Sequence, residues 1–471
     1  MGMLLLKLGL ALTYSNIGPG DSADYLIRAI SIRETGSLNI NFADRFLPGM
    51  LLPIPRPSVL TQPLFPLLIA GLSVLFGYEL AGRLVPILAG ALLPLVVFRL
   101  SKKFAGEKVS FTAAVLSAFV PFLFSYSTFI LTDIPFVFMI ALSYCLFLDY
   151  LERKTMRNAL LFGAALGFSY LLRSSAIFMM AAIGAHILLR QKKLLRKNLP
   201  HLAAALVIML LIVSPWLYRS SIANMEVFGT ASNPEPGMTL RMAGMARGYS
   251  QPEAGSLLSL SKIYTSAGRA ANYFFWMLPV YILTPFLAAL SIYYFLRCKF
   301  DARLQPVFFY FLLLLAFHSL WPWTAPRFFF PIVPFFCIFS AIALHKIFGG
   351  NWKLPLVFIC AVMISAGASH ALIVDTEIDP GYGEFAECVL YQTGDGAVII
   401  SSEPGLLHYL TRRRTVIAPN MEIGGAVDFL SGYGPTHIHL DGETVPPSLS
   451  EFYSTQIPLC MSGKQKLFAL P

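Results

Sequence analysis

The sequence predicts an all-α polytopic membrane protein, on the evidence of its composition, its apolar runs and the placement of its basic residues. Of 471 residues, 56% are hydrophobic and 13% are charged, whereas an ordinary soluble domain is roughly 25% charged. The mean hydropathy is +0.67. Soluble domains stop growing at about 250–300 residues, so a single soluble core could not bury this much apolar surface. The composition therefore excludes a soluble enzyme.

Ten apolar runs approach the roughly 20 residues that a helix needs to cross a bilayer. They cover residues 82–100, 109–128, 134–151, 158–172, 174–190, 201–217, 271–296, 306–324, 328–345 and 354–374. Residues 3–12 are also apolar, but as a helix they would reach barely half of a ~30 Å hydrocarbon core. We interpret them as the end of a first span with its N-terminus inside, and a signal peptide is the alternative. Together the runs predict about 11 transmembrane helices.

The basic residues predict the orientation of these spans. Lys and Arg gather in alternate connections, at residues 102–108, 153–157, 190–197, 297–303 and 346–353. The positive-inside rule makes these connections cytoplasmic. It also accounts for the net charge of +10 without a nucleic-acid partner, and no nucleic-acid motif occurs. We expect a multi-pass protein of the cell (inner or plasma) membrane, with its C-terminus outside the cytoplasm.

Two long loops are then external. The first covers residues 15–61, with an amphipathic helix expected over 24–33 and a Pro-rich stretch that cannot be regular helix. The second covers residues 218–270. Residues 62–77 are apolar but short for a span, so we expect an interfacial or re-entrant helix there.

The chain loses its membrane composition after residue 375. Residues 397–401 and 415–418 have strand-like patterns, and residues 404–410 between them are helix-like. The sequence therefore predicts a transmembrane domain over residues 1–375 and a small extracytoplasmic α/β domain over residues 376–471.

Three aspartates lie at the predicted external boundary, where ionisable groups are costly and are functional candidates by default. Asp21 and Asp24 follow the first span in GPGDSADYLIRAI, with Tyr25 beside them. Asp133 lies in FILTDIPFVF, in a short turn where a carboxylate must face protein, water or a ligand. Each aspartate could instead cap the start of a helix, and capping is compatible with function.

Four arginines form the complementary basic set: Arg56, Arg83, Arg173 and Arg327. A guanidinium is a natural partner for a phosphate oxygen at a membrane surface. Each arginine could equally be an interfacial anchor or the partner of one of the aspartates.

The sequence predicts no metal site. The six cysteines are isolated, without a CxxC pair, and His186 and His318 have no second ligand one helical turn away. Two scattered aspartates are a weak cation site, so we expect no obligatory metal, although a divalent cation could assist. Cys388 and Cys460 could pair outside the cytoplasm, but their spacing does not decide this.

The order of several segments resembles the membrane-integral glycosyltransferases of the GT-C class, specifically the bacterial and archaeal relatives of protein O-mannosyltransferases and aminoarabinose lipid A transferases. The matching segments are GDSADYLIRA, QPLFPLLIAGLSVLFGYELAGRL, LTDIP, LGFSYLLR and APRFFFPIVP. The loop at residues 218–270 follows the seventh span if residues 3–12 are the first, which is where this class places a loop over the active site.

The resemblance implies a GT-C fold with horizontal helices in the first external loop and a polyprenyl-phosphate sugar as donor. It makes Asp21 the candidate catalytic base. The common acidic pair of the first loop is broken here by Ser22, which leaves open whether Asp21, Asp24 or both serve. Asp133 becomes the acidic residue of the second loop. Arg173 and Arg327 are candidates for binding the donor phosphate, and Tyr25, Arg56 and Arg83 complete the candidate set for donor or acceptor binding.

The expected reaction is transfer of a hexose or pentose, with inversion, to a lipid, glycan or protein acceptor outside the cytoplasm. A carboxylate would take the proton of the attacking group, and arginine would stabilise the leaving phosphate. One alternative is a polysaccharide ligase or polymerase, whose key residues would be Arg241, Arg247 and Arg269. A flippase or transporter is the other, although it would need polar residues at mid-bilayer.

Overall fold

The structure is a computed structural model. It describes residues 7–9, 17, 21–43, 54–58, 61–190, 197–228, 268–298, 301–320, 325–376, 381–417, 430–441 and 456–470. Most of the predicted first span and most of the loop at 218–270 lie outside the described residues, as do Arg241 and Arg247.

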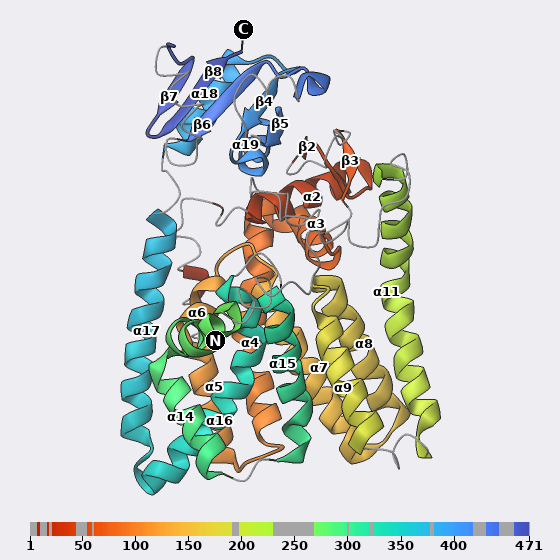
Figure 1. Ribbon diagram of the computed structural model, residues 1–471, viewed down its shortest axis with the longest axis vertical. Coiled ribbons are helices and arrows are strands. Elements are labelled where there is room, and N and C mark those ends of the chain that lie inside the picture. Colours follow the sequence, from red (N-terminus) through yellow and green to blue (C-terminus); the bar gives the residue numbers. More distant parts are fainter. Residues whose placement is uncertain are drawn as a thin grey trace.

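A helical bundle makes up most of the chain (Figure 1). Its helices are α3 (Leu64–Phe76), α4 (Tyr78–Ser101), α5 (Glu107–Phe119), α6 (Pro121–Tyr126), α7 (Asp133–Arg153), α8 (Met156–Leu172), α9 (Ala176–Arg190), α11 (Leu199–Phe228), η1 (Tyr273–Ile282), α14 (Thr284–Arg297), α15 (Gln305–Leu320), η3 (Pro326–Ile332), α16 (Val333–Phe348) and α17 (Lys353–Thr376). Each of the ten predicted runs therefore coincides with helix over most of its described residues. Within the described ranges, 5 helices are long and apolar enough to cross a membrane, or 6 if one bent pair counts as a span. The total of about 11 spans stays a prediction.

Two of the predicted runs are not single helices. The run at 109–128 divides between α5 and α6, where Pro121 begins a new helix after the extended Val120. The run at 271–296 was expected to be one span and is wrong in this respect, because its two halves meet at an angle of 107°. The bend lies at Thr284, whose φ is +66°. Pro285 follows it, and proline disfavours helical conformation in the preceding residue.

The centre of the bundle is α7, which packs against α4 and α8. Its Ile134, Val137 and Tyr144 are fully buried. The peripheral α11 instead exposes large apolar side chains such as Leu206 and Leu211, as expected where a helix faces lipid. It packs closely on α8, because a Cβ at Gly163 would come within 2.1 Å of a backbone oxygen of α11.

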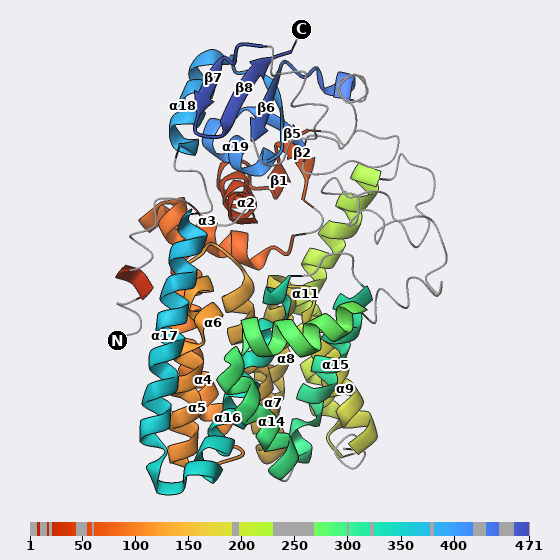
Figure 2. The same ribbon diagram turned by 60° about the vertical axis from the view of Figure 1, so that its left-hand side comes forward.

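The first external loop forms a layer on one end of the bundle. Helix α2 (Asp21–Thr35) begins three residues before the expected start and packs against α3. Strands β1 (Asn39–Ile40) and β3 (Arg56–Pro57) pair antiparallel, and β2 (Phe42–Ala43) lies between them in the chain. In both views of the ribbon, α2 lies between the bundle and the C-terminal sheet (Figures 1 and 2).

The C-terminal part holds a mixed sheet in the order β2-β5-β4-β6-β8-β7. Its elements are α18 (Tyr382–Gln392), β4 (Val398–Ser401), α19 (Pro404–Thr411), β5 (Arg414–Ile417), β6 (His437–Asp441), β7 (Cys460–Ser462) and β8 (Gln465–Ala469). The predicted strand–helix–strand order is confirmed by β4, α19 and β5. The edge strand β2 comes from the first external loop and runs parallel to β5, with Phe42 opposite Thr415.

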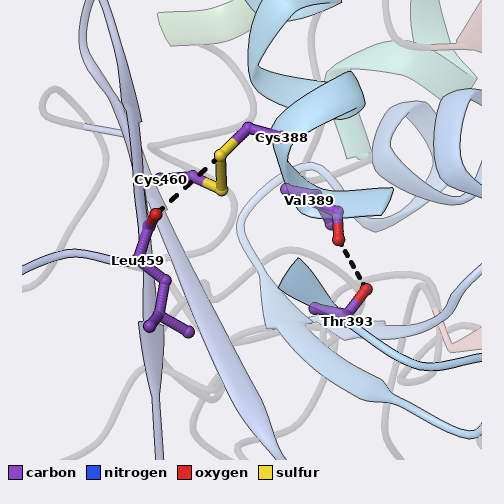
Figure 3. The surroundings of a disulfide bond; sticks show 5 residues. All are labelled: Cys388, Val389, Thr393, Leu459 and Cys460. Carbon is purple, nitrogen blue, oxygen red and sulfur yellow. Dashed lines mark hydrogen bonds between the residues drawn. A yellow bond between two sulfur atoms is a disulfide. The ribbon is translucent and has the colours of Figure 1, made fainter. Parts of the chain in front are cut away.

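A disulfide joins Cys388 of α18 to Cys460 of β7 (Figure 3). It confirms that these two cysteines are close enough to pair. Disulfides persist in oxidising compartments and are rare in the cytosol. The remaining four cysteines are free, and none of them lies in the C-terminal sheet.

Candidate active site

Four candidate residues converge where the bundle meets the first external loop. Asp21 is the first residue of α2 and Asp133 the first residue of α7. The start of a helix favours a carboxylate, because its backbone N–H groups carry partial positive charge. Arg173 directly follows α8, and Arg327 lies in η3. Each side chain thus lies at or next to the end of a helix, on the side of the bundle that meets the first external loop.

One guanidinium joins the two carboxylates. Arg327 Nη2 lies 2.5 Å from Asp21 Oδ2, and its Nη1 lies 4.0 Å from Asp133 Oδ2. The other oxygen of Asp133 accepts a hydrogen bond of 2.5 Å from Arg173 Nη1. Asp21 and Asp133, which are far apart in the chain, therefore belong to one cluster of two carboxylates and two guanidinium groups.

The two acids differ in burial. The side chain of Asp133 is 2% exposed, and that of Asp21 is 30% exposed. Since a general base must come within hydrogen-bond reach of the proton that it takes, Asp21 is the better placed of the two. Asp133 pairs with both arginines and so helps to orient them.

Aromatic side chains surround the cluster. The Tyr25 hydroxyl lies 3.2 Å from Thr132 Oγ1, and its ring meets Phe65 edge-on. Burial, followed by the negative charge of Asp21, raises the pKa of Tyr25, so the phenol stays neutral. Phe328 lies under both guanidinium groups, with its ring centre 5.3 Å from Arg173 and 5.9 Å from Arg327.

Thr132 and Phe328 were not among the predicted site residues. Both are direct sequence neighbours of residues that were, since Thr132 precedes Asp133 and Phe328 follows Arg327. That adjacency is a usable signal, because a residue beside a cluster member at a helix start is held close to the same site.

Asp24 forms a different ion pair from those that join Asp21 and Asp133. Asp24 Oδ2 lies 3.4 Å from Arg28 Nη1, one turn along α2. Arg28 also donates to Ser58 Oγ at 2.9 Å. This ion pair was not predicted, although its i, i+4 spacing is the standard signal for one on a helix.

Two further predicted arginines are buried in the structure. Arg56 is in β3, opposite Ile40 of β1. Arg83 is in α4, next to Gly82, where an added Cβ would meet the side chain of Ile130. Arg83 therefore lies where α4 packs against the turn that leads to Asp133.

Comparison with protein families gives two partial matches. The model described as dolichyl-phosphate-mannose-protein mannosyltransferase matches residues 56–218. The model described as Alg9-like mannosyltransferase family matches residues 259–382. A search of curated proteins finds no match.

Solved structures match nearly the whole chain. ArnT from Cupriavidus metallidurans bound to undecaprenyl phosphate has a TM-score of 0.61 at 13% identity, over 99% of this chain and 98% of that one. The Archaeoglobus fulgidus oligosaccharyltransferase in complex with Zn and sulfate has a TM-score of 0.61 at 15% identity, over 94% of this chain and 68% of that one. The chain has the GT-C fold. The predicted resemblance to GT-C membrane glycosyltransferases is thereby confirmed.

The acids of this GT-C site do not fit a metal centre. Asp21 and Asp133 both face Arg327, so a cation between them would have to displace a guanidinium. Over the ranges that the structure describes, no group of three or more His, Cys, Asp or Glu side chains could hold a metal ion. The position that a bridging cation would take between the two carboxylates belongs here to an arginine.

Proposed function

We propose that this GT-C protein transfers a sugar from a polyprenyl-phosphate donor to an extracytoplasmic lipid, glycan or protein acceptor, with inversion. The observation that carries the proposal is the contact of one guanidinium, Arg327, with the partly exposed Asp21 and the buried Asp133. The undecaprenyl phosphate of the Cupriavidus metallidurans structure supports a lipid-linked donor.

The reaction that we propose is a single displacement. The acceptor oxygen or nitrogen attacks the anomeric carbon while the bond from that carbon to the phosphate oxygen breaks. Asp21 takes the acceptor proton, and polyprenyl phosphate leaves with the bonding electron pair. Arg173 and Arg327 stabilise the charge that develops on the phosphate, since each guanidinium has five N–H donors and can hold a carboxylate and a phosphate together.

We place this site on the extracytoplasmic side. The cluster lies at the start of α7, whereas the basic connection after residue 153 lies at its other end, and basic connections are cytoplasmic. The disulfide of the C-terminal sheet supports the same assignment, because that sheet contains β2 of the first external loop.

The decisive experiment incubates the purified protein with a panel of polyprenyl-phosphate sugars and candidate acceptors and identifies the products by mass spectrometry. Asp21→Asn should lower the transfer rate by about 10²–10⁴-fold, the usual contribution of a general base. Asp301→Asn is a matched control, since Asp301 is 31% exposed and is paired with Arg303 at 2.7 Å in the connection between α14 and α15. The control should keep parental activity.

Other outcomes would favour the alternatives. An active Asp21→Asn protein would refute the assignment of the base. Movement of an intact lipid-linked sugar across vesicles would indicate a flippase. Loss of activity in Arg269→Ala, with Asp21→Asn unaffected, would favour the ligase or polymerase.

We also propose that no metal is required, because Arg327 supplies positive charge beside both carboxylates. Transfer by the purified protein should therefore be unchanged in EDTA. Loss of activity in EDTA that Mg²⁺ or Mn²⁺ restores would contradict this proposal.

A further inference from the structure

The C-terminal sheet rests on the helix that carries Asp21. Helix α19 packs against α2, and strand β2, which follows α2 in the first external loop, is an edge strand of the C-terminal sheet. Figures 1 and 2 both show α19 facing α2. The C-terminal residues are thus joined to α2 by side-chain packing and by strand pairing.

The tightest point of this contact is Gly405. A Cβ at this position would lie 2.7 Å from Asp24 Oδ1, so only a glycine lets the carboxylate approach. Gly405 is the second residue of α19, where backbone N–H groups lack partners within the helix and a negative charge is favourable. Arg28 pairs with the other oxygen of this carboxylate, with its Nη1 3.4 Å from Asp24 Oδ2. Asp24 therefore has contacts with its own helix, α2, and with α19.

A second contact lies one turn further along α19. The Tyr409 hydroxyl donates to Glu79 Oε1 at 2.8 Å, and Glu79 is in the first turn of α4. Residues 405 and 409 share one face of α19, because their spacing is i, i+4. That face therefore contacts α2 and α4 together.

We propose that α19 is a positioning element for the reaction, and that Asp24 is the residue through which it acts. Asp21 and Asp24 lie on adjacent positions of one helical face, three residues apart, so a tilt or rotation of α2 moves both. With Asp24 held by α19 and Arg28, Asp21 stays against Arg327. This inference rests on the proposed function, in which Asp21 is the base.

The test is a comparison of two glycines. Gly405→Ala puts a methyl carbon 2.7 Å from Asp24 Oδ1, which is too close, so the carboxylate or α19 must move. Gly383→Ala is the matched control, because Gly383 is also the second residue of a helix, α18, and has open space around its Cβ position. We expect Gly405→Ala to lower kcat about tenfold, since small misplacements of catalytic groups cost up to about 10²-fold. The KM for the donor and the melting temperature should stay parental, and Gly383→Ala should match the parent in all three.

A double-mutant experiment separates a positioning role of Asp24 from a role in the chemistry. Asp24→Ala should also lower kcat about tenfold, by loss of the same contact. The double variant with Gly405→Ala should be no slower than the slower single variant, because residues in contact have non-additive effects. Multiplied losses in the double variant would overturn the inference, and so would an Asp24→Ala protein as inactive as Asp21→Asn, because Asp24 would then act in the chemistry.

The two proposals fail separately. Parental kcat in Gly405→Ala, with Asp21→Asn inactive, would overturn the positioning role and leave the proposed function intact. An active Asp21→Asn protein would overturn the assignment of Asp21 as the base in the proposed function, and the positioning role with it.

Discussion

Helix α7 has a buried aspartate at each end, and the two differ in their partners. Asp133 at the outer end is 2% exposed and Asp149 near the inner end is 4% exposed. Asp149 pairs with Arg99 at 2.5 Å and Lys103 at 2.6 Å, from the last turn of α4 and from the turn directly after it. Asp133 instead receives Arg173 and faces Arg327, from distant parts of the chain.

The difference separates a structural ion pair from a reactive one. The inner carboxylate has two cations, and Glu152, the further acid there, is bound to Lys103. The outer cluster adds Asp21, an accessible carboxylate that shares a cation with the buried one. The same pairing chemistry therefore joins helices at one end of α7, and at the other end it holds the carboxylate that we propose as the base beside the arginines that we propose bind the phosphate.

The largest expected effect in this comparison follows removal of the shared cation. Arg327→Gln leaves both outer carboxylates without their common partner and removes a donor for the leaving phosphate. We expect the transfer rate to fall about 10²–10³-fold, as when a donor to a developing negative charge is lost, in initial-rate measurements on purified protein. Arg99→Gln is the matched inner control and should stay within about threefold, because Arg99 is 60% exposed and surface pairs contribute little. Equal losses in both variants would remove the distinction between the two ends.

The apolar helices, and the charged residues at their ends that form this site, could be predicted because each depends on local properties of the sequence. Lipid requires long apolar runs, and charged residues between them stand out. The meeting of Asp21 with Asp133 could only be inferred from the resemblance, since it depends on how helices far apart in sequence pack. The same holds for strand β2, whose two residues, Phe42 and Ala43, are too few to show a strand pattern.

Other features had local signals that hydropathy alone does not weigh. Pro285 marks the sharp bend before α14, although the apolar run continues through it. Asp24 and Arg28 have the spacing of a helical ion pair, which indicates a packing role for Asp24 and distinguishes it from Asp21. Gly405 gives no such signal. A side chain is excluded there by Asp24 of α2, a helix that lies far away in the chain.

A smaller effect is expected from Asp149→Asn, and it should fall on stability. The change removes the charge that pairs with Arg99 and Lys103. Most of the loss should come from the pair with Lys103, because Lys103 is 14% exposed whereas Arg99 is 60% exposed. The melting temperature in detergent should fall while kcat per folded molecule stays parental. Asp133→Asn should lower kcat as well, since Asp133 orients Arg173 and Arg327. A catalytic defect in Asp149→Asn without loss of stability would contradict the structural role of the inner pair.

The smallest effect is expected from Glu152→Gln. Glu152 is 43% exposed and contacts Lys103 at 2.6 Å, but Lys103 keeps Asp149 when this contact is lost. Burial lowers the pKa of Lys103, yet its bonds to Asp149 and Glu152 outweigh burial and leave the pKa raised. A raised lysine pKa means that the stabilisation is present at neutral pH and is lost only as the pH rises above the ordinary lysine value. We therefore expect Glu152→Gln to cost less than about 1 kcal/mol at neutral pH, and less still in high salt. A loss of melting temperature as large as that of Asp149→Asn would show that the exposed acid, and not the buried one, holds the inner end of α7 to α4.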